Sequence, residues 1–200
     1  MKLSAITKVL EDIGIASTFL ILLLTIGCIG GFKNPYATRA QCMIPSDFDV
    51  AKKHPYTIAV SQSTGGGNYT SSPMSILWDE EFTKALICSL MNSHLFNAVT
   101  DVNDETDVTD SNVADYILYV TILKYDKPIL GADLDIKTKM KWELKQTKNS
   151  QIVWSETIET TYKTKFSEEP GPMYRAQRAT EGSARANIRE GISRLSMATF

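Results

Sequence analysis

The chain has 200 residues, and its hydrophobic fraction (43%) and charged fraction (22%) are those of an ordinary globular protein. This length accommodates one domain with a hydrophobic core and an additional segment. The formal net charge of -2 excludes the strongly basic field with which a nucleic-acid-binding domain attracts phosphates.

The N-terminal part of the chain is typical of a secretory signal, because residues 13–32 are uncharged and follow a segment that contains two lysines. The run includes Leu24-Thr25-Ile26-Gly27-Cys28. This stretch resembles the lipobox of bacterial lipoproteins, whose cysteine thiol receives a diacylglyceryl group and becomes the first mature residue. The resemblance implies that Cys28 is the lipidation site, that residues 1–27 form a lipoprotein-type signal peptide and that residues 28–54 form a lipidated tether.

Two alternatives remain for this segment. It is long enough for an uncleaved transmembrane helix, since about twenty apolar residues cross a bilayer, and it could also be a helix buried in a cytosolic protein. Gly27, Gly30 and Gly31 favour cleavage over a stable span. Ile29, rather than aspartate, follows Cys28. By resemblance to enteric sorting rules, we expect a lipid-anchored protein of the outer membrane that faces the periplasm.

The other two cysteines, Cys42 and Cys88, would remain as an even pair once Cys28 is acylated. In an oxidising compartment they could form a disulfide. The alternative, which we favour for Cys88, is an unpaired thiol packed in a core helix. No cysteine or histidine has the spacing of metal ligands, so we expect neither a metal nor another cofactor.

The first half of the domain alternates between β-rich and amphipathic stretches. Residues 56–61 form a short β-rich run, and residues 76–95 show apolar side chains at helical spacing. An edge strand is expected at residues 98–102. The strand expected at residues 115–125 is apolar on both faces, which predicts a central position in the sheet.

The clearest pattern is a hairpin over residues 134–166, in which apolar and charged side chains alternate with a period of two. Such alternation suits a strand that is buried on one face and cannot serve a helix. The apolar positions of its first strand include Leu134, Ile136, Met140, Trp142 and Leu144. Residues 173–197 then form a helix with a narrow apolar stripe. We therefore expect an α+β fold, a two-layer sandwich in which an antiparallel sheet of four to five strands carries two helices on one face.

Several short segments resemble small lipoproteins of bacterial envelopes, specifically the group of transporter-auxiliary lipoproteins and the TolB N-terminal-like domain. They are Phe82-x-x-Ala85-Leu86-x-x-Ser89-Leu90, Leu95-Phe96, Ala114-Asp115-Tyr116, the pair Trp142 and Trp154, and Ala179-Thr180-Glu181-Gly182. The resemblance covers residues 56–197. It implies that residues 55–200 form a periplasmic α+β domain that binds other envelope components.

The function that we expect is that of a non-catalytic accessory component of an envelope transport or assembly complex. Its partners would be envelope proteins and the membrane, with self-association left open and no nucleic acid. The candidate contact surfaces are two basic stripes, Lys137, Lys139 and Lys141 on the hairpin and Arg175, Arg178, Arg185 and Arg189 on the last helix. The alternative is that both are simply solvated faces.

Two other functions remain open. The domain could bind a lipid or another small ligand between helices and sheet, with Tyr116, Tyr119, Trp142 and Trp154 as lining residues, although alternating aromatics in strands usually pack in a core. It could also be an envelope enzyme. Because nucleophile-elbow and zincin motifs are absent from the sequence, we do not expect an enzyme.

Overall fold

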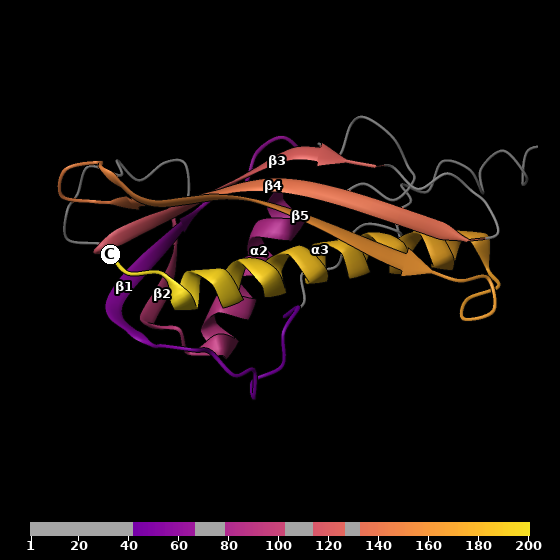
Figure 1. The fold of residues 1–200 in the computed structure, drawn as a ribbon, viewed down its shortest axis with the longest axis horizontal. Coiled ribbons are helices and arrows are strands. Elements are labelled where there is room, and N and C mark those ends of the chain that lie inside the picture. Colours follow the sequence, from indigo (N-terminus) through magenta and orange to yellow (C-terminus); the bar gives the residue numbers. More distant parts are fainter. Residues whose placement is uncertain (1–41, 67–78, 103–113, 127–132) are drawn as a thin grey trace, which may run out of the picture. The chain divides into compact units, whose positions relative to one another are not determined.

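The computed structural model of the chain describes residues 42–66, 79–102, 114–126 and 133–200, so the predicted signal peptide and Cys28 lie outside the described residues. All of the described residues belong to one compact unit, Tyr36–Phe200. Its elements in chain order are β1 (His54–Ser61), α2 (Asp79–Ser93), β2 (Phe96–Val102), β3 (Tyr116–Tyr125), β4 (Leu134–Gln146), β5 (Ile152–Thr164) and α3 (Pro172–Met197) (Figure 1).

The five strands form one sheet in the order β2-β1-β3-β4-β5. Strand β4 pairs antiparallel with both β3 and β5, whereas β1 pairs parallel with both β2 and β3. The predicted α+β class and strand number are confirmed, but the sheet is mixed rather than antiparallel throughout. For β1 and β2 the reason is the connection through α2, a crossover that returns the chain to the sheet in its original direction.

The predicted hairpin is confirmed as β4 and β5. Met140 lies opposite Ile158, and Trp142 lies opposite Glu156. Side chains of β4 alternate between buried and more exposed along the strand. The buried set faces the helices, and both helices lie on the same side of the sheet (Figure 1). The largest fully buried side chains are Trp142, Phe82, Ile58, Leu86, Leu90, Leu95, Leu118, Ile136, Met140, Leu144 and Ile158.

Helix α3 runs beneath β4 and β5 (Figure 1), and at two glycines an aromatic ring of the sheet lies directly against its backbone. A Cβ at Gly182 would collide with the ring of Tyr162 on β5, and a Cβ at Gly191 would collide with the ring of Trp142 on β4. The helix thus packs closely against rings from both β5 and β4.

The end of the predicted tether packs on the domain. Met43 and Ile44 are buried, and the backbone N–H of Met43 donates to Ser89 Oγ on α2 (2.8 Å). This contact brings Cys42 beside α2, where it forms a disulfide with Cys88. The disulfide alternative is therefore confirmed, and our preference for an unpaired Cys88 was wrong, because residues 42–44 belong to the folded unit.

Neither described helix is both long enough and apolar enough to cross a bilayer.

Candidate functional site: the groove between β5 and α3

The three predicted lysines lie on the outer face of β4, on the side away from the helices. Lys139 pairs with Glu159 of β5 (3.8 Å), and Lys141 pairs with Glu143 (3.0 Å). The Lys139–Glu159 pair is exposed to solvent and the Lys141–Glu143 pair is partly exposed, and surface ion pairs contribute little stability. The outer face is thus a mixed-charge surface rather than a purely basic one.

The four predicted arginines do not form one surface. Arg178, Arg185 and Arg189 are exposed on α3, but Arg175 is buried, with 3% of its surface exposed. Its Nη1 donates to the carbonyl oxygens of Glu169 (2.6 Å) and Pro170 (3.2 Å), which lie just before the helix. Arg175 is therefore corrected from a contact residue to a structural one. Because the lysines lie on the opposite side of the sheet, the structure does not bring the two basic stripes together.

A groove that sequence reasoning missed runs between β5 and the second half of α3. Strand β5 is 13 residues long and is the last strand of the sheet, so β4 is its only strand neighbour among the described elements. Two hollows that share Glu190 line this edge. The first, of roughly 560 Å³, is lined by Trp154, Glu156, Glu190, Arg194, Met197, Ala198 and Thr199. The second, of roughly 490 Å³, is lined by Phe48, Asp49, Thr160, Thr161, Ala186, Arg189, Glu190 and Ser193.

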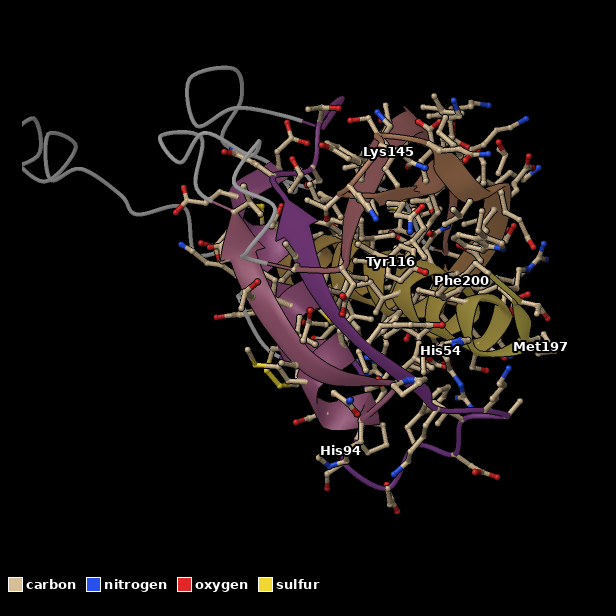
Figure 2. The ribbon with its side chains drawn as sticks, turned by 90° about the vertical axis from the view of Figure 1, so that its left-hand side faces the viewer. His54, His94, Tyr116, Lys145, Met197 and Phe200 are labelled. Atoms are coloured by element: carbon tan, nitrogen blue, oxygen red, sulfur yellow. A yellow bond between two sulfur atoms is a disulfide. The ribbon has the colours of Figure 1, made fainter. Side chains whose placement is uncertain are left out.

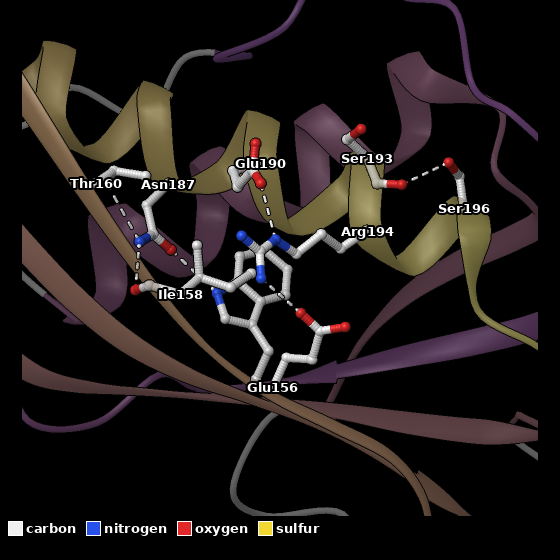
Figure 3. Close-up of polar contacts among 9 residues, drawn as sticks. Glu156, Ile158, Thr160, Asn187, Glu190, Ser193, Arg194 and Ser196 are labelled. Carbon is white, nitrogen blue, oxygen red and sulfur yellow. Dashed lines mark hydrogen bonds and ion pairs between the residues drawn. The ribbon is translucent and has the colours of Figure 1, made fainter.

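An ion-pair triad spans the first hollow and joins the strand to the helix. Arg194 Nη1 lies 2.9 Å from Glu156 Oε2, and Arg194 Nε lies 2.7 Å from Glu190 Oε1. Figure 3 shows the guanidinium of Arg194 between the two carboxylates. Hydrogen bonds to Glu156 and Glu190 raise the pKa of Arg194 above its usual value. The groove therefore carries fixed charges of both signs.

Below the groove, a buried amide holds β4, β5 and α3 together. Trp142 Nε1 donates to Asn187 Oδ1 (3.0 Å), and Asn187 Nδ2 donates to the carbonyl oxygen of Ile158 (3.2 Å) and to Thr160 Oγ1 (3.4 Å) (Figure 3). Asn187 is fully buried. Since a buried polar group is costly unless it is satisfied, these bonds fix the position of α3 under β5.

Large apolar side chains are exposed at both ends of β5. At its start, Ile152 is 47% exposed and Met197 of α3 is 64% exposed. Past its end, Phe166 is 52% exposed and Tyr174 is 63% exposed. Met197 also lines the first hollow, and exposed apolar side chains beside a groove are typical of a protein contact surface.

The aromatic residues proposed to line a ligand cavity serve mainly as core. Trp142 is fully buried, and Tyr116 is 7% exposed. The ring of Phe200 lies 5.1 Å from that of Tyr116 and 4.5 Å from that of His54 (Figure 2). His54 Nε2 donates to the carbonyl oxygen of Leu195 (3.0 Å). This cluster packs the end of α3 against β1 and β3.

Within the described ranges, no group of three histidine, cysteine, aspartate or glutamate side chains is placed to hold a metal ion. The groove thus offers hydrogen bonds, fixed charges and apolar area, which are the elements of binding.

No family model and no curated protein matches the sequence. Among solved structures, a Xanthomonas campestris protein of family model DUF330 is similar (TM-score 0.57, 11% identity, 81% of this chain and 94% of that chain). A hypothetical protein from Chlamydia trachomatis is similar as well (TM-score 0.51, 10% identity, 72% and 96%). The PelC dodecamer from Paraburkholderia phytofirmans matches more distantly (TM-score 0.42, 18% identity, 68% and 91%). The first two similarities establish that the chain shares its fold with small bacterial proteins.

Proposed function

We propose that the chain is a lipid-anchored lipoprotein of the bacterial outer membrane whose domain faces the periplasm. The observation that carries this proposal is the disulfide between Cys42 and Cys88, because such bonds persist in oxidising compartments and are rare in the cytosol. Cys28, which precedes this disulfide-bonded domain in a lipobox-like stretch, would be the attachment site. An anchor of two or more acyl chains holds a protein firmly to a membrane, whereas one chain binds weakly.

The role that we propose is non-catalytic: the domain acts as an accessory component of an envelope transport or assembly complex. Support comes from the groove along β5, which combines an open strand edge with the fixed charges of Glu156, Glu190 and Arg194. The exposed arginines Arg178 and Arg185 would extend the contact surface. The closer resemblance to transporter-auxiliary lipoproteins rests on the sequence segments described above.

The test is the intact mass of the full chain extracted from bacterial membranes, beside that of a Cys28→Ala variant. We expect the wild-type chain to begin at Cys28 and to carry acyl groups, and the variant to remain unprocessed. A Cys42→Ala, Cys88→Ala variant is the matched control and should be processed normally. An unacylated wild-type chain that retains residues 1–27 would overturn the lipid anchor.

The protein-binding role needs a second measurement, namely co-purification of envelope proteins with the wild-type chain after mild cross-linking. An Arg194→Glu variant places a third carboxylate beside Glu156 and Glu190 and should lose any partner that binds this groove. A Lys124→Glu variant, a charge reversal at an exposed position of β3 and outside the proposed contact surface, serves as the control. Equal recovery of every partner with wild type and Arg194→Glu would exclude the groove as the binding surface.

A further inference from the structure

We propose that the partner seated on the β5 edge is a second copy of this chain, paired antiparallel to the first about a two-fold axis at Thr161. The inference rests on the proposed function in one respect, the use of the groove as a protein-binding surface. It does not depend on the lipid anchor. The two copies would form one continuous sheet, β4-β5 of one chain joined to β5-β4 of the other.

The first step is the outer edge of β5, with which no other described strand pairs. An edge strand presents backbone N–H and C=O groups that can pair with another strand, and proteins usually keep such edges short or interrupt them with charges or proline. Strand β5 spans 13 residues and contains no proline, and its charged residues are Glu156, Glu159 and Lys163. Thr161, at which we place the axis, is exposed.

The second step is charge complementarity on the outer face of the strand. Glu159, Thr161 and Lys163 all point to this face, and all three are exposed. With Thr161 on the axis, Glu159 lies directly opposite Lys163 of the partner subunit, and symmetry creates the pair twice. Opposite charges at directly facing positions stabilise a strand pair, whereas like charges destabilise it. An axis at Glu159 or at Lys163 would instead place two like charges face to face.

The third step is the position of the exposed apolar side chains. The same register places Phe166 of the partner subunit opposite Glu156, within the diagonal reach of Trp154. The exposed phenylalanine past the end of one strand would then cover the first hollow of the other copy, beside Met197. Because a two-fold interface uses the same patch on both copies, both apolar ends of each strand become covered at once.

The fourth step is the space beneath the joined sheet. Adjacent strands lie about 4.8 Å apart. Each α3 lies under β4 and β5, so the two helices would be separated by about two strand spacings, which falls near the usual interhelical distance of about 8–10 Å. The residues of α3 that line the second hollow are Ala186, Arg189, Glu190 and Ser193, of which Ala186 and Ser193 have small side chains.

Cysteine cross-linking in the full-length protein in native membranes tests the register. In a Thr161→Cys variant the two new thiols would face each other across the axis, where strand partners are about 4.5–5.5 Å apart and within the range of a disulfide. Lys137→Cys is the matched control, because Lys137 is the exposed residue opposite Thr161 on β4. We expect a disulfide-linked dimer from Thr161→Cys in at least tenfold greater yield than from Lys137→Cys. Equal yields would overturn the proposal.

Charge reversal supplies an independent test in detergent-extracted protein, with the mass of the complex measured by light scattering. Glu159→Lys and Lys163→Glu should each weaken the dimer about tenfold or more, since each replaces two attractive pairs by two repulsive ones. The double variant restores opposite charges across the axis. Because Glu159 also pairs with Lys139 (3.8 Å) and Lys163 with Asp135 (3.2 Å) of the same chain, the swap is combined with Lys139→Glu and Asp135→Lys, and this quadruple variant should recover the wild-type dimer. Failure of the quadruple variant to recover, while it remains folded, would contradict the pairing.

The outcomes separate this inference from the proposed function. A monomer under all conditions, together with an acylated Cys28 and a groove-dependent envelope partner, would overturn self-pairing and leave the proposed function standing. A Thr161-linked dimer together with an unacylated, unprocessed chain would establish self-pairing and overturn the lipid anchor.

Discussion

The backbone of Gly191 in α3 lies directly against the indole ring of Trp142 on β4, and a Cβ at this position would come closer than 3.0 Å to the ring. One turn earlier, Asn187 accepts the hydrogen bond of the same indole. A single tryptophan therefore sets both the distance and the rotation of α3 relative to the sheet. The groove beside β5 depends on this placement, because its helical wall is the same part of α3.

Gly191→Ala should destabilise the domain by about 1–3 kcal/mol, the usual cost of forcing extra volume into a packed core. The sign of this stability change is informative, since alanine in place of glycine within a helix normally stabilises by about 0.5–1 kcal/mol. Urea unfolding followed by circular dichroism measures the difference. In a Trp142→Phe background the ring atoms that meet the new methyl group are gone, so the same substitution should cost less. An equal cost in both backgrounds would rule out the ring contact as its cause.

Asn187→Ala should lower the free energy of unfolding by about 2–4 kcal/mol, because it leaves the Trp142 indole N–H and the Ile158 carbonyl without their buried partner. Thermal or urea unfolding gives the value. Arg185→Ala is a suitable control on the same helix, since Arg185 is exposed and surface substitutions usually change stability by less than about 0.5 kcal/mol. Similar losses of unfolding free energy in the two variants would show that the hydrogen bonds of Asn187 do not stabilise the domain.

Reduction of the Cys42–Cys88 disulfide, which links residues 46 positions apart, should lower the free energy of unfolding by about 4 kcal/mol on the chain-entropy model. The measurement compares urea unfolding with and without reductant. The Cys42→Ala, Cys88→Ala variant should be insensitive to reductant and should resemble the reduced wild type. A reductant effect that persists in the double variant would point to a different thiol.

Stability should also fall at alkaline pH because of Tyr125, whose hydroxyl shares a hydrogen bond with Thr180 Oγ1 (2.7 Å). Burial raises the pKa of Tyr125 above its ordinary value of 10.0. The folded chain therefore keeps the phenolic proton at a pH at which the unfolded chain has lost it. The stability contributed by this group is complete below pH 10 and declines as the pH rises toward the raised pKa. Unfolding measured between pH 8 and pH 11 should show a shallower decline in Tyr125→Phe, and identical slopes would contradict this assignment.

The sequence alone predicts the β4–β5 hairpin, because period-two alternation identifies both the strand and the face that is buried. It did not reveal that β1 runs parallel to β2 and β3, since alternation carries no information on strand direction. It raised the Cys42–Cys88 disulfide only as an alternative, because Met43 and Ile44 were too few apolar residues to distinguish an ordered segment from a tether.

The candidate site was harder to predict than the fold. Helical spacing placed Arg175 in a stripe with Arg178 and Arg185. In the structure Arg175 is buried, and its guanidinium donates to two carbonyl oxygens of the segment just before α3. The groove exists because β5 is the last strand of the sheet, and the order of strands in the sheet could not be predicted from the sequence pattern. A signal was nevertheless present in Glu156, a charged residue on the inward face of β5, which anticipated a polar partner such as Arg194.

The disulfide has a mechanical consequence. Tension applied to the chain from the side that precedes Cys42 enters the domain at α2, through a covalent bond to Cys88, and bypasses the non-covalent contacts of β1. Helix α2 lies between β1 and β2 in the chain and covers the sheet. A pull on this protein is therefore shared between α2 and the chain segment that leads from residue 42 to β1, so that less of it acts on the N-terminal end of β1.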